Sequence, residues 1–304
     1  MVLAIIAMGY AGGRLYYRVT DGFTVGNITS DYSYDSRWDI RKLDNSEEIL
    51  VDSILAQPFS YLGKGCQSYV FKSADGKYVI KFFKYQRFRP QAWLDYFAFI
   101  PAVDTYRLGK IEKKLKKREG VFRSWKLAFE ELQPETGLIF VHLNKTQDLK
   151  KSLKITDKMG FEHQLDLDQM EFLIQRKAQS YCGRIEELMD NEETDRAKLL
   201  LSRTLTLLRS EYSRGFADND HALMQNSGVL DGLPIHVDVG QFVRNEQASE
   251  PAFYKQDLFN KTYKFRRWLH KKYPELEVFL EDRLKDIIGD QFSTMKPHFK
   301  PHDE

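Results

Sequence analysis

Three short runs of β-forming residues, close together in the chain, are the feature that most restricts the fold. They are Phe59–Leu62, Tyr69–Lys72 and Tyr78–Lys84. Asp75-Gly76 lies between the second and third runs, and this dipeptide is a strong signal for a two-residue hairpin turn. The sequence therefore predicts that three antiparallel strands open a folded domain near residue 57.

Two further strands and one helix are predicted after this hairpin. Gly137–Leu143 and Ser152–Met159 have the composition of strands, and apolar residues at helical spacing predict a helix over residues 123–132. We therefore expect a five-stranded antiparallel sheet with one helix inserted after the third strand.

From Leu167 onward the pattern predicts mostly helices. Met170, Leu173, Ile174 and Lys177 share one helical face, as residues three and four apart do. This spacing predicts that the second half of the chain begins with a helix.

A longer helix is predicted from near Asn191 to near Gly215, because leucines form a stripe along one of its faces. Two short strands, Gly228–Leu230 and Leu233–Val237, follow and are joined by a second Asp-Gly turn. Residues 254–289 are predicted to be helical again.

Together these elements predict an α+β chain of four segments. Residues 1–13 are apolar, residues 14–55 form an extension with loops, residues 56–165 carry the sheet and residues 166–304 are mostly helical. A length of 304 residues fits one domain of two lobes or two modest domains. Hydrophobic residues make up 42% of the chain, which is ample for a buried core.

Charge and cysteine content restrict the classes of partner and compartment. The 46 basic side chains nearly balance the 44 acidic ones, so the overall charge does not favour nucleic acid as a partner. The two cysteines, Cys66 and Cys182, suggest neither a metal site nor a disulfide framework. A reduced, cytoplasmic compartment is therefore expected.

The apolar N-terminus has three interpretations. Residues 1–13 carry no charged side chain before Arg14. They are fewer than the roughly 20 residues that a membrane-spanning helix needs, and they lack the basic start of a signal peptide. A short anchor at a membrane surface, the end of a longer hydrophobic segment and a buried strand all remain open.

The first candidate site is Gly63-Lys64-Gly65, followed by Lys81 on the next predicted hairpin strand. Glycines let the backbone approach phosphate oxygens because no Cβ stands in the way. Lys81 is expected on the same strand face as Val79 and Phe83. Separately, the glycines could be an ordinary turn and Lys81 an edge lysine, but their order favours a phosphate site.

The second candidate site is a set of oxygen-bearing side chains around the second hairpin. Asp220 precedes the hairpin, Asn226 lies at its start and Asp238 lies at its exit. Oxygen ligands of this kind suit Mg²⁺. Each residue alone is typical of a turn or a cap, whereas their order along the chain favours a common metal site.

Taken in order, these features resemble the protein-kinase-like superfamily from about Phe59 to Gly240. Asp238-Val239-Gly240 is similar to the metal-binding Asp-Phe-Gly motif, with valine in place of phenylalanine. Asp218-Asn219-Asp220 occupies the place of His-Arg-Asp, and Asp220 and Asp238 are 18 residues apart, as in that family.

The resemblance implies a two-lobe fold that binds ATP and Mg²⁺ between its lobes. In that fold Gly63-Lys64-Gly65 would lay backbone N–H groups over the ATP phosphates, and Lys81 would bind the α- and β-phosphate oxygens. Asn226 and Asp238 would hold Mg²⁺. Asp220 would orient the hydroxyl of a protein or small-molecule acceptor and receive its proton.

Several residues depart from the family pattern. The metal-binding asparagine normally lies five residues after the aspartate, where this chain has Gln225, so Asn226 and Gln225 are both candidates and Asn226 is preferred. The candidate carboxylate partners of Lys81 are Glu112, Glu119, Glu130 and Glu131, and Glu119 is preferred because Glu130 and Glu131 lie close to the end of the predicted helix. Only 64 residues follow Gly240, so the second lobe resembles the short lobes of small-molecule kinases such as the aminoglycoside phosphotransferases.

Two other functions remain open on the sequence. The irregular segment around Asp220 and the short final lobe are compatible with a pseudokinase, that is, a nucleotide-binding or interaction module without transfer activity. An unrelated α+β domain with chance motifs would not bind nucleotide at all.

Overall fold

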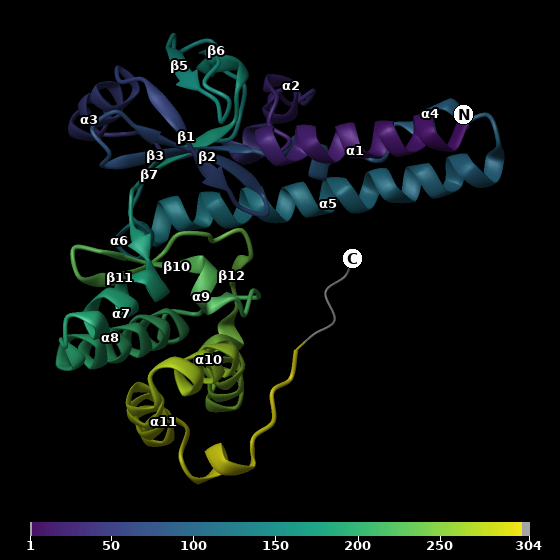
Figure 1. The fold of residues 1–304 in the computed structure, drawn as a ribbon. Coiled ribbons are helices and arrows are strands. Elements are labelled where there is room, and N and C mark those ends of the chain that lie inside the picture. Colours follow the sequence, from purple (N-terminus) through teal and green to yellow (C-terminus); the bar gives the residue numbers. More distant parts are fainter. Residues whose placement is uncertain (1, 300–304) are drawn as a thin grey trace. The chain divides into compact units, whose positions relative to one another are not determined.

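The computed structural model describes residues 2–299, with side chains from residue 7 onward. The chain divides into two compact units (Figure 1). Unit 1 comprises residues 1–130 and 138–177, and unit 2 comprises residues 131–137 and 178–304. Residues 166–177, which the sequence analysis grouped with the second half of the chain, therefore fold with the first.

Unit 1 is built on a seven-stranded sheet. In spatial order its strands are β4 (Leu138–His142), β7 (Phe172–Arg176), β3 (Tyr78–Phe83), β2 (Ser68–Ser73), β1 (Phe59–Lys64), β5 (Ser152–Thr156) and β6 (Glu162–Asp166). All neighbours are antiparallel except β1 and β5, which are parallel. The α+β class is confirmed, whereas the sheet is larger than the expected five antiparallel strands.

Strand β7 replaces the helix that was predicted over residues 170–177. Phe172, Leu173 and Ile174 are all fully buried, because β7 lies between β3 and β4 and is covered on both faces. A short apolar run of this kind has no period-2 alternation, so its periodicity does not distinguish a strand from a helix. Lys177 lies just beyond the strand.

One long helix packs against the sheet of unit 1. Helix α5 (Pro101–Glu131) has 31 residues and begins well before the predicted residue 123. On β3 the odd-numbered side chains face this helix, and Phe83 contacts Phe122 at 5.1 Å between ring centroids. The even-numbered Phe82 joins the core on the other face, where it contacts Phe71.

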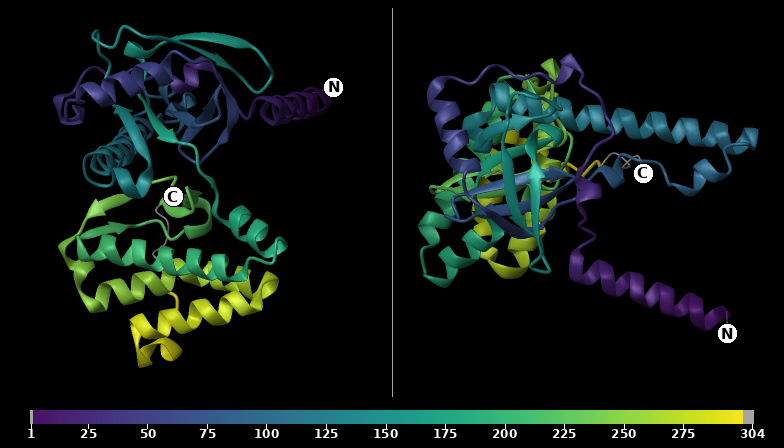
Figure 2. Two further views of the ribbon diagram at one scale, coloured as in Figure 1. Left: turned by 90° about the vertical axis from the view of Figure 1, so that its left-hand side faces the viewer. Right: turned by 90° about the horizontal axis from the view of Figure 1, so that it is seen from above.

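The N-terminal extension contains helices that were not predicted. They are α1 (Val2–Thr20), α2 (Val25–Ile28) and α3 (Asn45–Leu55). The first residues are thus helical, so the interpretation as a buried strand is wrong. Residues 7–19 are exposed, and α1 projects away from the sheet (Figure 2). Among residues 2–299, no helix combines the length and the apolar content that crossing a bilayer requires.

The remaining elements of unit 1 are short. Helix α4 (Trp93–Tyr96) precedes α5, and single 3₁₀ turns occur at Ser36–Trp38, Tyr85–Arg87 and Leu167–Gln169. The turn at residues 36–38 ends a segment that crosses one face of α5, where the Trp38 ring contacts Phe122.

Unit 2 is mostly helical, as predicted. Its helices are α6 (Gln133–Thr136), α7 (Tyr181–Asp190), α8 (Thr194–Ser213), α9 (Leu223–Asn226), α10 (Pro251–Lys272) and α11 (Pro274–Ile288), with 3₁₀ turns at Glu246–Ser249 and Asp290–Thr294. Helices α7, α8, α10 and α11 bury their apolar faces in one common core.

Two small sheets complete unit 2. The predicted hairpin is confirmed as β10 (Ser227–Leu230) and β11 (Leu233–His236), with β8 (Gln179–Ser180) on its outer side. Strand β9 (Phe216–Asp218) pairs with β12 (Phe242–Arg244). Residues 219–226 therefore connect β9 to β10, and residues 237–241 connect β11 to β12. Both loops are held at each end by a strand.

Candidate functional site

The glycine-rich turn of unit 1 joins β1 to β2. The backbone N–H of Gly65 donates to the carbonyl of Ser68 at 2.9 Å, and the β1–β2 register shifts between Tyr61 and Gly63. Neither Gly63 nor Gly65 has a left-handed backbone, and a Cβ at Gly63 would meet no atom within 4 Å. The fold of the turn therefore does not itself require these glycines, and they leave the backbone open to approach.

The side chain of Lys64 is engaged within unit 1. Its Nζ lies 3.0 Å from a carboxylate oxygen of Asp21 and 4.0 Å from the centroid of the Tyr17 ring. Asp21 also accepts hydrogen bonds from Lys158 and Tyr61. Because Lys64 is held by this network, only its backbone N–H is a candidate for binding a ligand at the turn.

Lys84 is a second cation at this turn, and the sequence analysis did not single it out. Its Nζ donates to the carbonyl of Gly65 at 2.5 Å and lies 4.6 Å from the Tyr69 ring centroid. Its backbone N–H donates to Gln67 at 2.8 Å. Burial lowers the pKa of Lys84 to about 8. The only signal in the sequence is its position three residues after Lys81.

Lys81 lies in the middle of β3, on the face predicted for it. It is paired with Val70 of β2 and Leu173 of β7, and its side chain is 8% exposed. Its Nζ lies 5.5 Å from the Trp125 ring centroid. The sheet therefore positions a nearly buried ammonium group against α5.

Glu119, the expected partner of Lys81, is bound elsewhere. It accepts a hydrogen bond from the Arg37 guanidinium at 3.0 Å. Glu119 and Trp125 are six residues apart on α5, which places them about 120° apart around the helix. Since Trp125 faces Lys81, Glu119 points toward the N-terminal extension instead, and we leave it out of the candidate site.

In unit 2 a buried ion cluster holds the start of the loop that carries Asp220. The Nζ of Lys261 on α10 donates to the carbonyls of Asp218 at 2.7 Å and Asp220 at 3.1 Å. It also lies 3.6 Å from the Asp218 carboxylate and 3.8 Å from that of Asp257. Burial raises the pKa of Asp218, although Lys261 opposes this effect.

The same cluster accounts for both histidines of the region. His221 lies 2.9 Å from Asp257, and His236 lies 2.7 Å from the buried Glu211. Burial alone would lower the pKa of His236, but the Glu211 carboxylate outweighs it and raises the pKa. Each histidine thus has a carboxylate partner of its own, and the two do not form a metal pair.

Asp220 is partly exposed, whereas Asp218 is buried. The backbone N–H of Asp220 donates to Oδ1 of Asp218 at 3.0 Å, and Oδ1 of Asp220 accepts from the N–H of Ala222 at 2.9 Å. Asp218 therefore acts as a positioning group that fixes the main chain of the loop. Asp220 is the aspartate of this loop that a ligand could reach.

Asn226 and Asp238 are brought together by the β10–β11 hairpin. The pairing of Ser227 with His236 makes the residues on either side neighbours, and the carbonyl of Asn226 accepts from Val237 at 2.7 Å and from Asp238 at 3.3 Å. Asp238 in turn accepts from the N–H of Gly240 at 3.2 Å. Gln225 is exposed on α9.

This pair supplies one amide and one carboxylate. Within residues 2–299, no three His, Cys, Asp or Glu side chains are grouped so that they could hold a metal ion by themselves. A divalent cation at Asp238 would therefore need oxygen atoms from Asn226, from water or from a bound ligand.

Comparisons with known proteins add little to this picture. No family model and no curated protein matches the chain. A solved structure described as the complex structure of Rv3197-erythromycin from Mycobacterium tuberculosis is similar to 92% of this chain and 74% of that chain, with 12% identity and a TM-score of 0.35. A likeness at this level carries no argument about fold or function.

Proposed function

We propose that this protein is an ATP- and Mg²⁺-dependent phosphotransferase of the protein-kinase-like superfamily, acting on an alcohol group of a protein or a small molecule. The observation that carries the proposal is the placement of Asn226 beside Asp238 at the base of one hairpin, with the partly exposed Asp220 in the loop before it.

The architecture of unit 1 supports the proposal. Five of its strands, β4-β7-β3-β2-β1, are neighbours in an antiparallel array, and α5 is inserted after β3. The fifth strand of this array is β7 and not the predicted Ser152–Met159, so the support lies in the order of β1, β2 and β3 and in the helix that follows them. The hairpin β5–β6 is an addition at one edge.

Each unit would contribute a different part of the chemistry. In unit 1 the open backbone at Gly63 and Gly65 would bind phosphate oxygens, and Lys81 would neutralise their charge. In unit 2 Asn226 and Asp238 would hold Mg²⁺ together with phosphate oxygens, and Asp220 would orient the acceptor hydroxyl and take its proton. Phosphoryl transfer depends mainly on positioning and charge neutralisation, so this set is sufficient.

A pseudokinase is the alternative, and two observations favour it. Asn226 lies six residues after Asp220 rather than five, and one oxygen of Asp220 already accepts from the N–H of Ala222. A loop held in this way could bind Mg·ATP without transferring the phosphoryl group.

The test compares Mg·ATP binding and turnover in three variants of the full chain, each with one substitution in unit 2. Asp238→Asn should remove the rise in thermal stability that Mg·ATP gives the wild type, because a ligand of the folded state stabilises it by mass action. Asp220→Ala should keep that rise and lower turnover by roughly 10²- to 10⁴-fold, the usual contribution of a general base. Asp286→Asn, which changes an exposed carboxylate, should behave as the wild type in both assays.

Three results would decide the matter. Unchanged Mg·ATP binding in Asp238→Asn would overturn the metal assignment. Binding without transfer to water, proteins or small alcohols in the wild type would establish the pseudokinase. Absence of any Mg·ATP effect on the wild type would reject both functions.

A further inference from the structure

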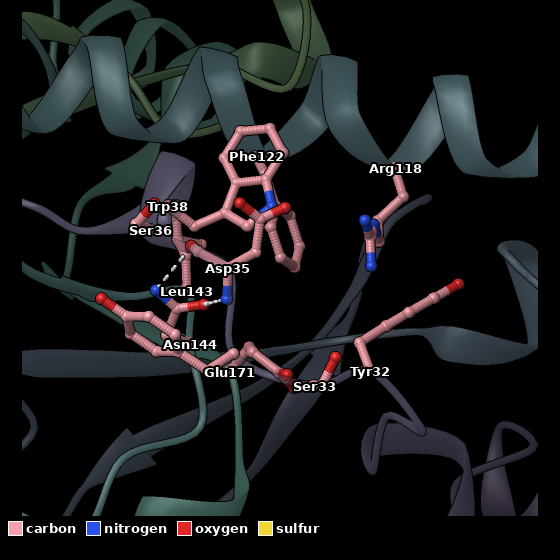
Figure 3. Close-up of a pocket in the computed structure, with 11 residues that line it drawn as sticks. Tyr32, Ser33, Asp35, Ser36, Trp38, Arg118, Phe122, Leu143, Asn144 and Glu171 are labelled. Atoms are coloured by element: carbon pink, nitrogen blue, oxygen red, sulfur yellow. Dashed lines mark hydrogen bonds between the residues drawn. The ribbon is translucent and has the colours of Figure 1, made fainter.

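Unit 1 contains a cavity that none of the proposed nucleotide-binding residues lines. Its volume is about 450 Å³, and it lies between residues 32–38, helix α5 and the chain after β4 (Figure 3). Asn144 closes one side, where its side-chain amide holds the backbone of Asp35 through two hydrogen bonds of 3.0 and 3.1 Å. The walls of the cavity are therefore fixed by specific contacts.

A buried cation lines this cavity. Arg118 on α5 is only 5% exposed, and its guanidinium lies 3.8 Å from the Tyr32 ring centroid. Its Nε has no hydrogen-bond partner, and within residues 2–299 no carboxylate forms an ion pair with it. Because a buried charge is costly unless it is paired, this guanidinium calls for an anion from outside the chain.

A second unused donor lines the same cavity. The indole Nε1 of Trp38 is buried and has no hydrogen-bond partner, and the side chain is 6% exposed. Buried donors in folded proteins are nearly always satisfied, so an exception requires an explanation. Two exceptions in one cavity, one of them cationic, have a common explanation in an acceptor that is absent from the polypeptide.

The acidic side chains of the cavity already have hydrogen-bond partners. Both carboxylate oxygens of Glu171 accept hydrogen bonds, from Ser30 at 2.6 Å and from Tyr85 at 2.8 Å, and burial raises its pKa. The Asp35 carboxylate is bound by Arg37 at 2.7 Å. Hydrogen bonds from Arg37 lower the pKa of Asp35 and the charge of Arg118 adds to this effect, but Arg118 forms neither a hydrogen bond nor an ion pair with Asp35 or Glu171.

We propose that this cavity is a binding site for a small organic anion, in which Arg118 and the Trp38 indole N–H bind a carboxylate or phosphate group and the aromatic rings of the cavity hold a planar body. The rings come from Tyr32, Tyr34, Trp38 and Phe122. The site lies wholly within unit 1, and it does not depend on the proposed phosphotransfer.

The probes are benzoate and phenyl phosphate, with benzamide as a neutral molecule of the same shape. Binding to the purified chain is measured by titration calorimetry. We expect saturable binding of at least one anion and no measurable binding of benzamide. The preferred anion distinguishes a carboxylate site from a phosphate site.

Two variants test the assignment of the donors. Arg118→Met keeps most of the side-chain volume and should weaken anion binding by about 10- to 150-fold, the usual range for a hydrogen bond to a charged group. Trp38→Phe removes the N–H while keeping an aromatic ring, and should weaken binding about tenfold. Lys116→Met, which changes an exposed cation on the same helix, should leave binding unchanged.

Far-ultraviolet circular dichroism shows whether each variant is folded, and Trp38→Phe, the milder change, provides the test if Arg118→Met does not fold. The proposal is overturned if the folded wild type binds neither anion, if benzamide binds as tightly as benzoate, or if the folded variants bind as the wild type does.

Discussion

The two units differ in how they neutralise the charges that they bury. In unit 2, Lys261 lies among the carboxylates of Asp218 and Asp257, and His236 pairs with Glu211. In unit 1, Lys84 and Arg118 are buried against aromatic rings, and Lys84 donates a hydrogen bond to a backbone carbonyl rather than to a carboxylate. The Lys261 cluster of unit 2 thus contains its own counterions, whereas the neighbours of Lys84 and Arg118 in unit 1 are aromatic rings and a carbonyl.

This difference suggests separate tasks for the two units. A self-neutralised cluster holds a loop in one conformation, and in unit 2 that loop carries Asp220. Under the proposal made above, the buried Arg118 of unit 1 instead serves to bind an external anion. Lysine variants in each unit, each compared with an exposed lysine variant or with the wild type, test this contrast.

The largest effect is expected for Lys261→Met. Removing the cation would leave the buried Asp218 without its nearest counterion, and breaking a buried ion pair typically costs about 3–5 kcal/mol. The free energy of unfolding, measured with a chemical denaturant, should fall by this amount. Lys264→Met, an exposed position on the same helix, serves as the control. A loss below about 1 kcal/mol would show that the cluster is not the main support of the loop.

A smaller effect, on ligand affinity rather than stability, is expected for Lys81→Ala. If this lysine binds phosphate oxygens, ATP affinity should fall about 10- to 150-fold, as expected for a charge-assisted hydrogen bond, while adenosine affinity changes little. Calorimetry with both ligands gives the comparison, and the exposed Lys77→Ala is the control. Equal losses for ATP and adenosine would identify Lys81 as a structural residue.

The smallest effect is expected for Lys84→Met. At pH 7 the variant loses the hydrogen bond to Gly65, which lowers stability, but it no longer buries an ammonium group, which raises stability. Because these effects oppose each other, the free energy of unfolding should change by no more than about 1 kcal/mol. The pKa of Lys84 is about 8 in the folded chain and near 10.4 when unfolded.

This pKa difference also determines whether the stability of the folded chain rises or falls with pH. Between these two values the unfolded chain keeps a proton that the folded chain has released, so wild-type stability should rise with pH in this window. The rise should be reduced in Lys84→Met, as measured by denaturant titrations at pH 7, 9 and 10.5. Parallel pH profiles for the two proteins would show that Lys84 is not the group that titrates.

Sequence patterns predicted part of the regular structure in each unit. The Asp-Gly turns placed two hairpins correctly, and the leucine stripe predicted α8. The order of residues also brought Asn226 and Asp238 to one hairpin, which the hydrogen bonds of the Asn226 carbonyl confirm. Local turn chemistry and helical periodicity act within a few residues, so a single sequence contains them.

What the sequence did not predict depends on contacts between distant residues. Lys261 reaches Asp218 from 43 positions away, and the Trp38 ring meets Phe122 across 84 positions (122 − 38). The run Phe172–Ile174 became a strand because two neighbouring strands were available on either side. Glu119 was preferred as the partner of Lys81 from its position along the predicted helix, whereas the phase of α5 turns it toward Arg37.

The parallel pairing of β5 with β1 has a consequence for self-association. An open strand edge invites pairing with another chain and is a common start of aggregation. Strand β5 pairs with Phe59 and Ser60 at the start of β1, and β6 becomes the outer strand of the sheet. The exposed side chains of β6 include Glu162 and Asp166, and Glu162 pairs with Lys154. The added hairpin therefore ends the sheet in a short, charged strand that discourages intermolecular pairing.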